Sequence, residues 1–252
     1  MALKIETPLT VNAYINGEIV EAQDHAPREN PAKPDETAGY WPKNTVEEAK
    51  QAIDSADEAF KSWKHSEMKD RIERMQKGVQ KIKDNQDDLA KLLSKEHGKP
   101  IYDAQGELTV SLIFMEYAVE NAERVYKEEV NEDERGKNIL RHDPIGVVSA
   151  ISPWNYPLAL STEKIAPALL AGNTMVMKPS PMAPLTVTLV TQMVAEEFPE
   201  GVLNIVNGDA DIGIELTSND KVRKIAFTGG TNTGRHIMKA AADTIKTVTL
   251  EL

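Results

Sequence analysis

The sequence predicts an α/β fold built on a doubly wound parallel sheet, preceded by a layer of helices. From Pro144 onward, short runs rich in β-branched residues alternate with helical segments through short connectors. Such alternation forms right-handed βαβ units, whose parallel strands carry helices on both faces. Before Pro144, apolar residues recur at helical spacing instead. The expected architecture is therefore Rossmann-like, with N-terminal helices.

The first 63 residues are expected to hold a hairpin, a connector and a helix. Asn16-Gly17 stands between apolar flanks and predicts a type I′ hairpin across residues 11–20. Residues 27–42 are interpreted as a Pro-rich connector. Thr45-Val-Glu-Glu48 is a capping box, which opens a helix running to about Trp63.

Two further helices and an extended region follow. Apolar residues at three- and four-residue steps predict a second helix from Met68 to near Gly98. The same spacing predicts a third helix around residues 108–119. Residues 128–137 are highly charged and turn-like, and residues 139–142 begin an extended segment.

The C-terminal half is expected to alternate between strand and helix. Its strands are short and apolar enough to be buried on both faces. The expected strands are 147–151, 174–178, 203–206, 224–227 and 247–250. The expected helices are 161–171, 184–197, 212–218 and 232–242.

Composition excludes several classes of function. The net charge of -11, from 29 basic and 40 acidic residues, opposes binding to nucleic acid or anionic lipid. The sequence has no cysteine, which excludes thiol nucleophiles and thiolate metal ligands within these residues. Its five histidines show no metal-ligand spacing, so no metal site is expected. Residues 1–10 show no secretory leader pattern and no apolar run is long enough to span a membrane, so the expected location is cytoplasmic.

Polar residues gather at the carboxyl ends of the expected strands, where open parallel sheets bind ligands. The four strand-end segments are Ser152-Pro-Trp-Asn-Tyr-Pro157, Lys178-Pro-Ser-Pro181, Thr228-Gly-Gly-Thr-Asn-Thr-Gly234 and Glu251-Leu252. In the third, Gly229 and Gly234 join a strand to a helix, where backbone amides suit a pyrophosphate. The segment lacks the usual G-x-G-x-x-G pattern, and a glycine-rich turn with no ligand accounts for it equally well.

Three side chains in these segments have chemical uses, each with a structural alternative. Lys178 suits ribose hydroxyls or a phosphate, unless it is an exposed lysine at a strand end. Glu251 suits a general base in a partly desolvated site, unless it is a solvated carboxylate. The amide of Asn155 suits a developing oxyanion, unless it only ties down its own turn.

Taken together, these segments resemble the aldehyde dehydrogenase family over almost the whole chain. Tyr14-Ile-Asn-Gly17 and Glu96-His-Gly-Lys-Pro100 add less specific matches. The landmarks, in the order of that family, are Pro144-Ile-Gly-Val-Val148, Pro153-Trp-Asn-Tyr-Pro157, Pro167-Ala-Leu-Leu-Ala-Gly-Asn173, Met177-Lys-Pro-Ser180, Gly201-Val-Leu-Asn-Ile-Val206, Phe227-Thr-Gly-Gly230 and Leu250-Glu-Leu252.

The resemblance implies a coenzyme cleft and roles for its residues. Lys178 would lie near the adenosine ribose of the coenzyme and the Gly229–Gly234 turn near its pyrophosphate. Asn155 would stabilise the oxyanion, and Glu251 would be the general base that activates a thiol or a water. The other implied coenzyme-binding residues are Ile151, Ser152, Pro153, Trp154, Ser180, Pro181, Gly213, Phe227, Thr228, Gly230 and Leu252.

The resemblance also bears on domains and activity. Residues 1–252 would form the NAD(P)-binding domain, with a β-extension at about 126–143 that takes part in oligomerisation, so the complete enzyme is expected to be a homo-oligomer. In such enzymes a cysteine attacks the aldehyde and hydride passes to the nicotinamide. The sequence stops within what looks like a Glu-Leu-Gly-Gly-Lys segment, before that cysteine. The catalytic domain is therefore expected to be absent, and the chain inactive alone.

The sequence fits two coenzymes and more than one role for the chain. NAD-preferring members often place a glutamate three residues after the lysine, where this sequence has Pro181. NADP use is therefore open, with NAD slightly preferred. A serine in many members is Gly230 here. The expected function is the coenzyme-binding part of an enzyme that oxidises an aldehyde to an acid; the alternatives are a non-catalytic nucleotide-binding or assembly module, or an inactive truncated product.

Overall fold

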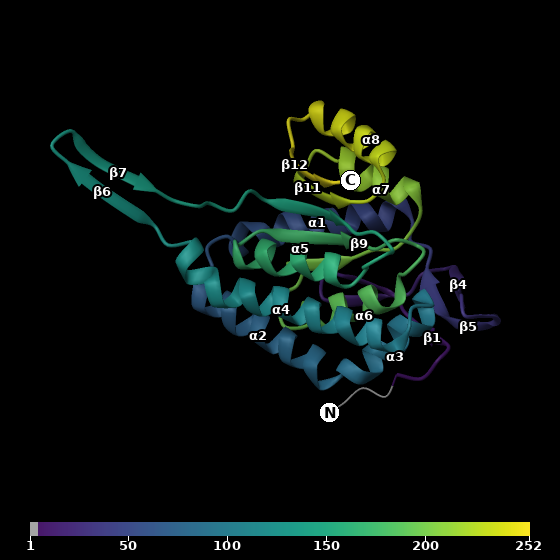
Figure 1. The fold of residues 1–252 in the computed structure, drawn as a ribbon. Coiled ribbons are helices and arrows are strands. Elements are labelled where there is room, and N and C mark those ends of the chain that lie inside the picture. The colour runs from purple at the N-terminus through teal and green to yellow at the C-terminus, as the bar shows by residue number, and fades with distance from the viewer. Residues whose placement is uncertain (1–4) are drawn as a thin grey trace.

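A seven-stranded sheet forms the centre of the computed structural model, which describes residues 5–252 (Figure 1). Its strand order is β12-β11-β8-β9-β10-β2-β3. The parallel strands are β8 (Val147–Ile151), β9 (Thr174–Lys178), β10 (Leu203–Ile205), β11 (Val222–Thr228) and β12 (Thr247–Glu251). The hairpin of β2 (Ala13–Ile15) and β3 (Glu18–Val20) adds antiparallel strands at one edge. The predicted strands are confirmed.

Helices cover both faces of this sheet, because its strands are apolar on both sides. Val148 and Met175 belong to the core under α5 (Ala159–Leu170) and α6 (Leu185–Ala195). Their neighbours Val147 and Val176 belong to a second core. That core lies under α1 (Val46–Trp63), α7 (Ala210–Ser218) and α8 (Thr231–Ala242). This alternation confirms the doubly wound fold.

An outer layer of helices packs over α5 and α6 (Figure 1). It consists of α2 (Met68–Asp84), α3 (Gln86–His97) and α4 (Ile101–Val125). The prediction of one helix from Met68 to Gly98 was wrong, because the chain breaks at Asn85 with φ -118° and ψ 10°. The Asn85 amide donates to the Lys81 carbonyl at 2.8 Å. A short amide side chain offers the backbone this alternative partner and so ends α2.

Residues 27–42 form strands, so the interpretation as a connector was wrong. A three-stranded sheet of order β1-β5-β4 contains β1 (Leu9–Thr10), β4 (His25–Asn30) and β5 (Lys33–Pro42). Pro27 lies in β4, which is an edge strand, and the register shifts just beyond it at Arg28/Glu29. Proline is tolerated at such edges and irregularities because no ladder hydrogen bond is lost there.

A two-stranded hairpin extends from the body of the molecule (Figure 1). It pairs β6 (Glu129–Asp133) with β7 (Gly136–Leu140), and all its strand residues are exposed. The turn-like interpretation of 128–137 was therefore wrong for most of its length, since only residues 134–135 form the turn between the strands. The hairpin lies where the family resemblance implied a β-extension.

The local signals at the start of the chain are confirmed. Asn16 and Gly17 have φ of 54° and 82°, as the turn of the β2–β3 hairpin requires. The reciprocal hydrogen bonds of the capping box join Thr45 and Glu48 at the start of α1. Within residues 5–252, no helix is long and apolar enough to cross a membrane.

Candidate functional site

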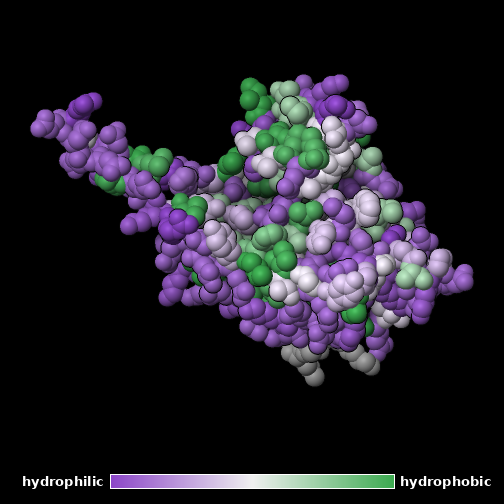
Figure 2. Space-filling model, in the orientation of Figure 1, coloured by the Kyte–Doolittle hydropathy of each residue, from purple (hydrophilic) through white to green (hydrophobic). Residues whose placement is uncertain are grey.

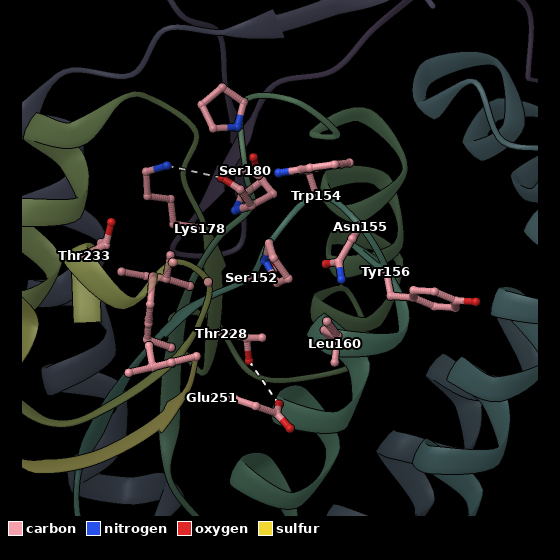
Figure 3. Close-up of a pocket in the computed structure, with 18 residues that line it drawn as sticks. Ser152, Trp154, Asn155, Tyr156, Leu160, Lys178, Ser180, Thr228, Thr233 and Glu251 are labelled. Carbon is pink, nitrogen blue, oxygen red and sulfur yellow. Dashed lines mark hydrogen bonds between the residues drawn. The ribbon is translucent and has the colours of Figure 1, made fainter. Parts of the chain in front are cut away.

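A cavity of about 1010 Å³ opens at the carboxyl ends of β8, β9, β11 and β12. Figure 3 shows Lys178, Asn155 and Glu251 directed into it from three separate segments. All but two of the residues predicted for the site line this cavity. They are Ile151, Ser152, Pro153, Trp154, Asn155, Lys178, Ser180, Pro181, Phe227, Thr228, Gly229, Gly230, Glu251 and Leu252.

Two predicted residues lie outside the lining, and four lining residues were missed. Gly234 does not line the cavity but packs against Leu252, which does. An added Cβ at Gly234 would lie 2.6 Å from the Leu252 side chain. Gly213 lies on α7 with open space at its Cα. Three of the missed residues belong to the strand-end segments themselves and could have been predicted from their position there. The fourth lies on α5 and reaches the cavity only because of how that helix packs. The missed residues are Tyr156, Pro179, Thr233 and, on α5, Leu160.

Lys178 is a buried cation at the end of β9. Its side chain is 5% exposed, so it is not the solvated lysine of the structural alternative. Burial lowers the pKa of Lys178 from 10.5 to about 8, while the charges of Asp209 and Asp211 act in the opposite direction. Nζ donates to the Pro179 carbonyl at 3.2 Å, and it forms no ion pair within residues 5–252. The ammonium thus has donors left for a ligand in the cavity.

The loop after β9 turns tightly beside Lys178. The Ser180 hydroxyl accepts a hydrogen bond from the Met182 amide at 3.2 Å, and the Ser180 carbonyl accepts one from the Ala183 amide at 3.1 Å. The proton of the Ser180 hydroxyl is left to donate elsewhere. Pro181 is half-buried next to it.

The first turn of α8 presents free backbone amides to the cavity. Gly230 is the N-cap residue of α8 and has no side chain to accept from these amides. An added Cβ at Gly230 would meet no atom within 4 Å, so the space before the helix is open. At Gly229 a Cβ would lie 2.5 Å from the Phe227 ring, so any larger residue there would force the ring to move. The turn therefore has room for an anion at Gly230, whereas at Gly229 it packs against the Phe227 ring.

Asn155 lies in the loop after β8, with Trp154 and Tyr156 on either side. Within the described residues, its backbone carbonyl accepts from Lys99 Nζ at 3.2 Å, whereas its side-chain amide makes no hydrogen bond. The amide therefore does not tie down its own turn, which was the structural alternative. It is exposed and points into the cavity (Figure 3).

Glu251 ends β12 on the opposite wall of the cavity. Its carboxylate accepts from the Thr228 hydroxyl at 3.4 Å, and that hydroxyl accepts from Lys164 Nζ at 2.9 Å. The side chain of Glu251 is exposed, as in the alternative of a solvated carboxylate at a strand end, and not partly desolvated. Glu251 is therefore an exposed carboxylate that is linked through the Thr228 hydroxyl to Lys164.

Apolar side chains are also exposed on parts of the molecule that do not line the cavity. Figure 2 shows them over α4 and α5 and on parts of the β6–β7 hairpin. On α4 the exposed side chains include Ile113, Phe114 and Tyr117. On the hairpin they are Val130, Ile139 and Leu140.

Comparisons with known sequences match this chain to one family. The model of the aldehyde dehydrogenase family matches residues 19–252. A glutarate-semialdehyde dehydrogenase of Pseudomonas putida is 39% identical over 257 residues, covering 100% of this chain and 53% of that protein. The NADP(+) succinate-semialdehyde dehydrogenase of Escherichia coli is 39% identical over 95% of this chain and 51% of that protein. The chain spans about half the length of the curated relatives it matches.

Solved structures agree with these matches. An aldehyde dehydrogenase from Brucella melitensis biovar abortus superposes with a TM-score of 0.93 at 38% identity, over 100% of this chain and 53% of that one. A point mutant of betaine aldehyde dehydrogenase from Staphylococcus aureus, in complex with NAD+, gives 0.93 at 32% identity over 100% of this chain and 52% of that one. The order of the sequence landmarks, the fold and these matches agree, and the chain belongs to the aldehyde dehydrogenase family.

Proposed function

We propose that residues 1–252 are the coenzyme-binding part of an NAD(P)-dependent aldehyde dehydrogenase, which in its complete form oxidises an aldehyde to a carboxylic acid. One observation carries the proposal: a single cavity brings together a buried cation, an uncapped helix N-terminus, an amide donor and a carboxylate. The family membership supports the same function. The nucleophilic cysteine would be supplied outside these residues, since the sequence has none.

The residues present fit a nicotinamide dinucleotide. Lys178 would hold the ribose or phosphate of the adenosine half, because its ammonium is buried and forms no ion pair with residues 5–252. The amides at the start of α8 would hold the pyrophosphate, next to the open space at Gly230. The bound coenzyme supplies the hydride acceptor of the reaction.

Asn155 and Glu251 are placed for acid–base and electrostatic work on the substrate side. The free amide of Asn155 would donate to the oxygen of the reacting carbonyl as it gains negative charge. Glu251 would accept a proton from the nucleophile or from water, since its carboxylate lines that wall of the cavity. The Thr228 hydroxyl, held by Lys164, would orient the Glu251 carboxylate.

Coenzyme preference is open between NAD and NADP. The Escherichia coli relative is named for NADP(+), while the Staphylococcus aureus structure contains NAD+. Pro181 offers no carboxylate to repel a 2′-phosphate, and the Ser180 hydroxyl has a proton to donate to one. Both coenzymes are therefore part of the proposal.

An assembly role is a second proposal, favoured by the β6–β7 hairpin. Its strands leave the body of the molecule with every residue exposed, including Val130, Ile139 and Leu140. Exposed apolar groups on a two-stranded ribbon are usually covered by a partner. We propose that residues 126–143 make contacts in the homo-oligomer of the complete enzyme; a complete enzyme that stays monomeric at all concentrations in light scattering would contradict this. A cytoplasmic location is also proposed, for cell fractionation to test.

The catalytic part of the proposal is tested by incubating the purified chain with NAD+ or NADP+ and a panel of aldehydes. We expect no formation of NADH or NADPH, because no thiol is present to form the covalent intermediate. Reduction of either coenzyme would contradict the requirement for an external cysteine. A Glu251→Gln variant would then show whether the observed activity uses the proposed base.

A further inference from the structure

The turn at the end of α3 contacts both loops that wall the cavity. Its residues are Glu96, His97, Gly98 and Lys99, of which Gly98 adopts φ +84° and ends the helix. This segment resembled the family only weakly in the sequence, and none of its residues lines the cavity. Its contacts nevertheless determine where the cavity walls lie.

Glu96 holds the loop that follows β9. Its carboxylate is fully buried and accepts from the amides of Leu185 at 2.7 Å and Thr186 at 2.8 Å, one with each oxygen. These are first-turn amides of α6, whose own N-cap, Pro184, has no side chain that can accept them. Residues 179–184 are thus fixed between Lys178 and the anchored start of α6.

Lys99 and Glu107 hold the loop that follows β8. Glu107, from α4, accepts from the amides of Leu158 at 2.8 Å and Ala159 at 3.2 Å with one carboxylate oxygen. Its other oxygen pairs with Lys99 Nζ, and the two side chains are 0% and 9% exposed. Lys99 Nζ also donates to the Asn155 carbonyl at 3.2 Å and lies 4.7 Å from the centre of the Tyr156 ring.

The turn itself is anchored away from the cavity. The Arg28 guanidinium donates to the Glu96 carbonyl at 2.9 Å, and the Ser94 hydroxyl donates to the Lys99 carbonyl at 2.7 Å. The His97 ring lies 6.1 Å from that of Trp154, at an angle of 30°. A rigid backbone segment therefore links the two loops.

We propose that Glu96, Lys99 and Glu107 are positioning residues for the cavity: Glu96 fixes the loop of Ser180, while Lys99 and Glu107 fix the loop of Asn155. The expected effect of these residues on coenzyme binding rests on the proposed coenzyme function. Their expected effect on loop dynamics rests on the hydrogen bonds alone. The two halves act on separate loops, so each can be broken without the other.

Glutamate-to-glutamine substitutions provide the sharpest perturbation. Glu96 and Glu107 each use both carboxylate oxygens as acceptors, whereas an amide of the same shape has only one. Glu96→Gln and Glu107→Gln therefore break one contact each without opening a cavity. Glu116→Gln is the matched control, because Glu116 is also on α4 but pairs with Lys83 at the surface.

Amide hydrogen exchange tests the positioning directly. Glu107→Gln should speed exchange at Leu158 and Ala159 about tenfold, the size expected when the shared acceptor of both amides loses its charge, and leave Leu185 and Thr186 unchanged. Glu96→Gln should do the reverse, and the control should change neither. Exchange that rises in both loops together, or in neither, would overturn the proposal.

Coenzyme affinity, followed by quenching of tryptophan fluorescence with NADH, separates positioning from stability. Both variants should bind about tenfold more weakly at temperatures where they are fully folded, with the control unchanged. Binding at wild-type affinity despite altered exchange would overturn the proposal. Failure of the wild type to bind NADH would refute the coenzyme function instead, and exchange would still decide the positioning.

If Glu107→Gln does not fold, the double variant Lys99→Met with Glu107→Gln replaces it, because it leaves no unpaired buried charge. The Asn155 carbonyl then loses its donor. Faster exchange confined to residues 155–159, with weaker NADH binding, is expected. Unchanged exchange there would contradict the role of Lys99.

Discussion

Replacing Lys178 with methionine should make the chain more stable and, at the same time, a poorer binder of dinucleotides. Methionine keeps the length and apolar stem of the side chain and removes only the ammonium. That ammonium is buried, and no ion pair within residues 5–252 compensates for its lost hydration. The charge therefore destabilises the free chain and becomes useful only when an anionic or hydroxyl-rich ligand enters the cavity.

The magnitude follows from the pKa of Lys178. A lowering from 10.5 to about 8 corresponds to roughly 3 kcal/mol, at about 1.4 kcal/mol for each tenfold change in proton affinity. At pH 7 the lysine is charged in both the folded and unfolded states, so Lys178→Met can recover up to that amount. For a chain of this size, the melting temperature would rise by roughly 6 to 12 °C.

The pH dependence provides an independent check with a definite sign. Between pH 8 and 10.5 the unfolded chain holds a proton on Lys178 that the folded chain has released. Stability of the wild type should therefore rise with pH across this window, and the contribution should vanish in Lys178→Met. Dinucleotide affinity should fall as the pH rises above 8, because Lys178 then loses its positive charge.

Thermal melting and calorimetric titration with NADH and NADPH measure both effects. Affinity should fall roughly tenfold or more on losing a charged hydrogen-bond donor. Lys224→Met is the matched control, since burial also lowers the pKa of Lys224 but this lysine lies outside the main cavity. The control should keep its affinity. A Lys178→Met chain that is less stable, or that binds as the wild type does, would contradict the role of Lys178 as a buried cation that binds the coenzyme.

Three other substitutions test further parts of the site. Gly229→Ala should lower the unfolding free energy by about 1–3 kcal/mol in denaturant melts, because its Cβ would displace Phe227, whereas Gly230→Ala, which meets no atom but is a poorer N-cap, should cost less; equal effects would contradict the packing. Pro181→Glu should raise the ratio of NAD to NADP affinity about tenfold in competitive titrations, since a carboxylate repels the 2′-phosphate; an unchanged ratio counts against this. Burial raises the pKa of Glu96 to about 7, so stability should fall as pH rises from 4.5 through 7, and Glu96→Gln should flatten that slope; a slope that persists would place its origin elsewhere.

Elements whose signals are local were predictable from the sequence. The β-branched runs at 147–151 and 174–178 match β8 and β9 at both ends, and the capping box at Thr45 marks the start of α1. The break at Asn85 was missed because the apolar stripe continues across it and α4 and α6 bury both sides. The strands of residues 25–42 were missed because prolines and charged residues interrupt the apolar alternation that marks a strand. These strands are stabilised by pairing with each other, which the local sequence does not reveal.

The position of the site was predictable, whereas the environment of its residues was not. The carboxyl ends of parallel strands lie at one edge of a sheet, and this rule predicted that Lys178, Asn155 and Glu251 lie close together. All three line one cavity. Burial of Lys178 and exposure of Glu251 depend on what the rest of the fold places around them, which strand position does not reveal. Glu96 and Glu107 were missed because their partners lie more than 50 residues away along the chain.

Calorimetric titration of the wild-type chain with NAD+ and NADP+ tests the central claim most directly. We expect saturable binding of at least one of the two at one site per chain, weakened by Lys178→Met and unaffected by Lys224→Met. A folded, monodisperse chain that binds neither dinucleotide would contradict the assignment of this cavity to a coenzyme.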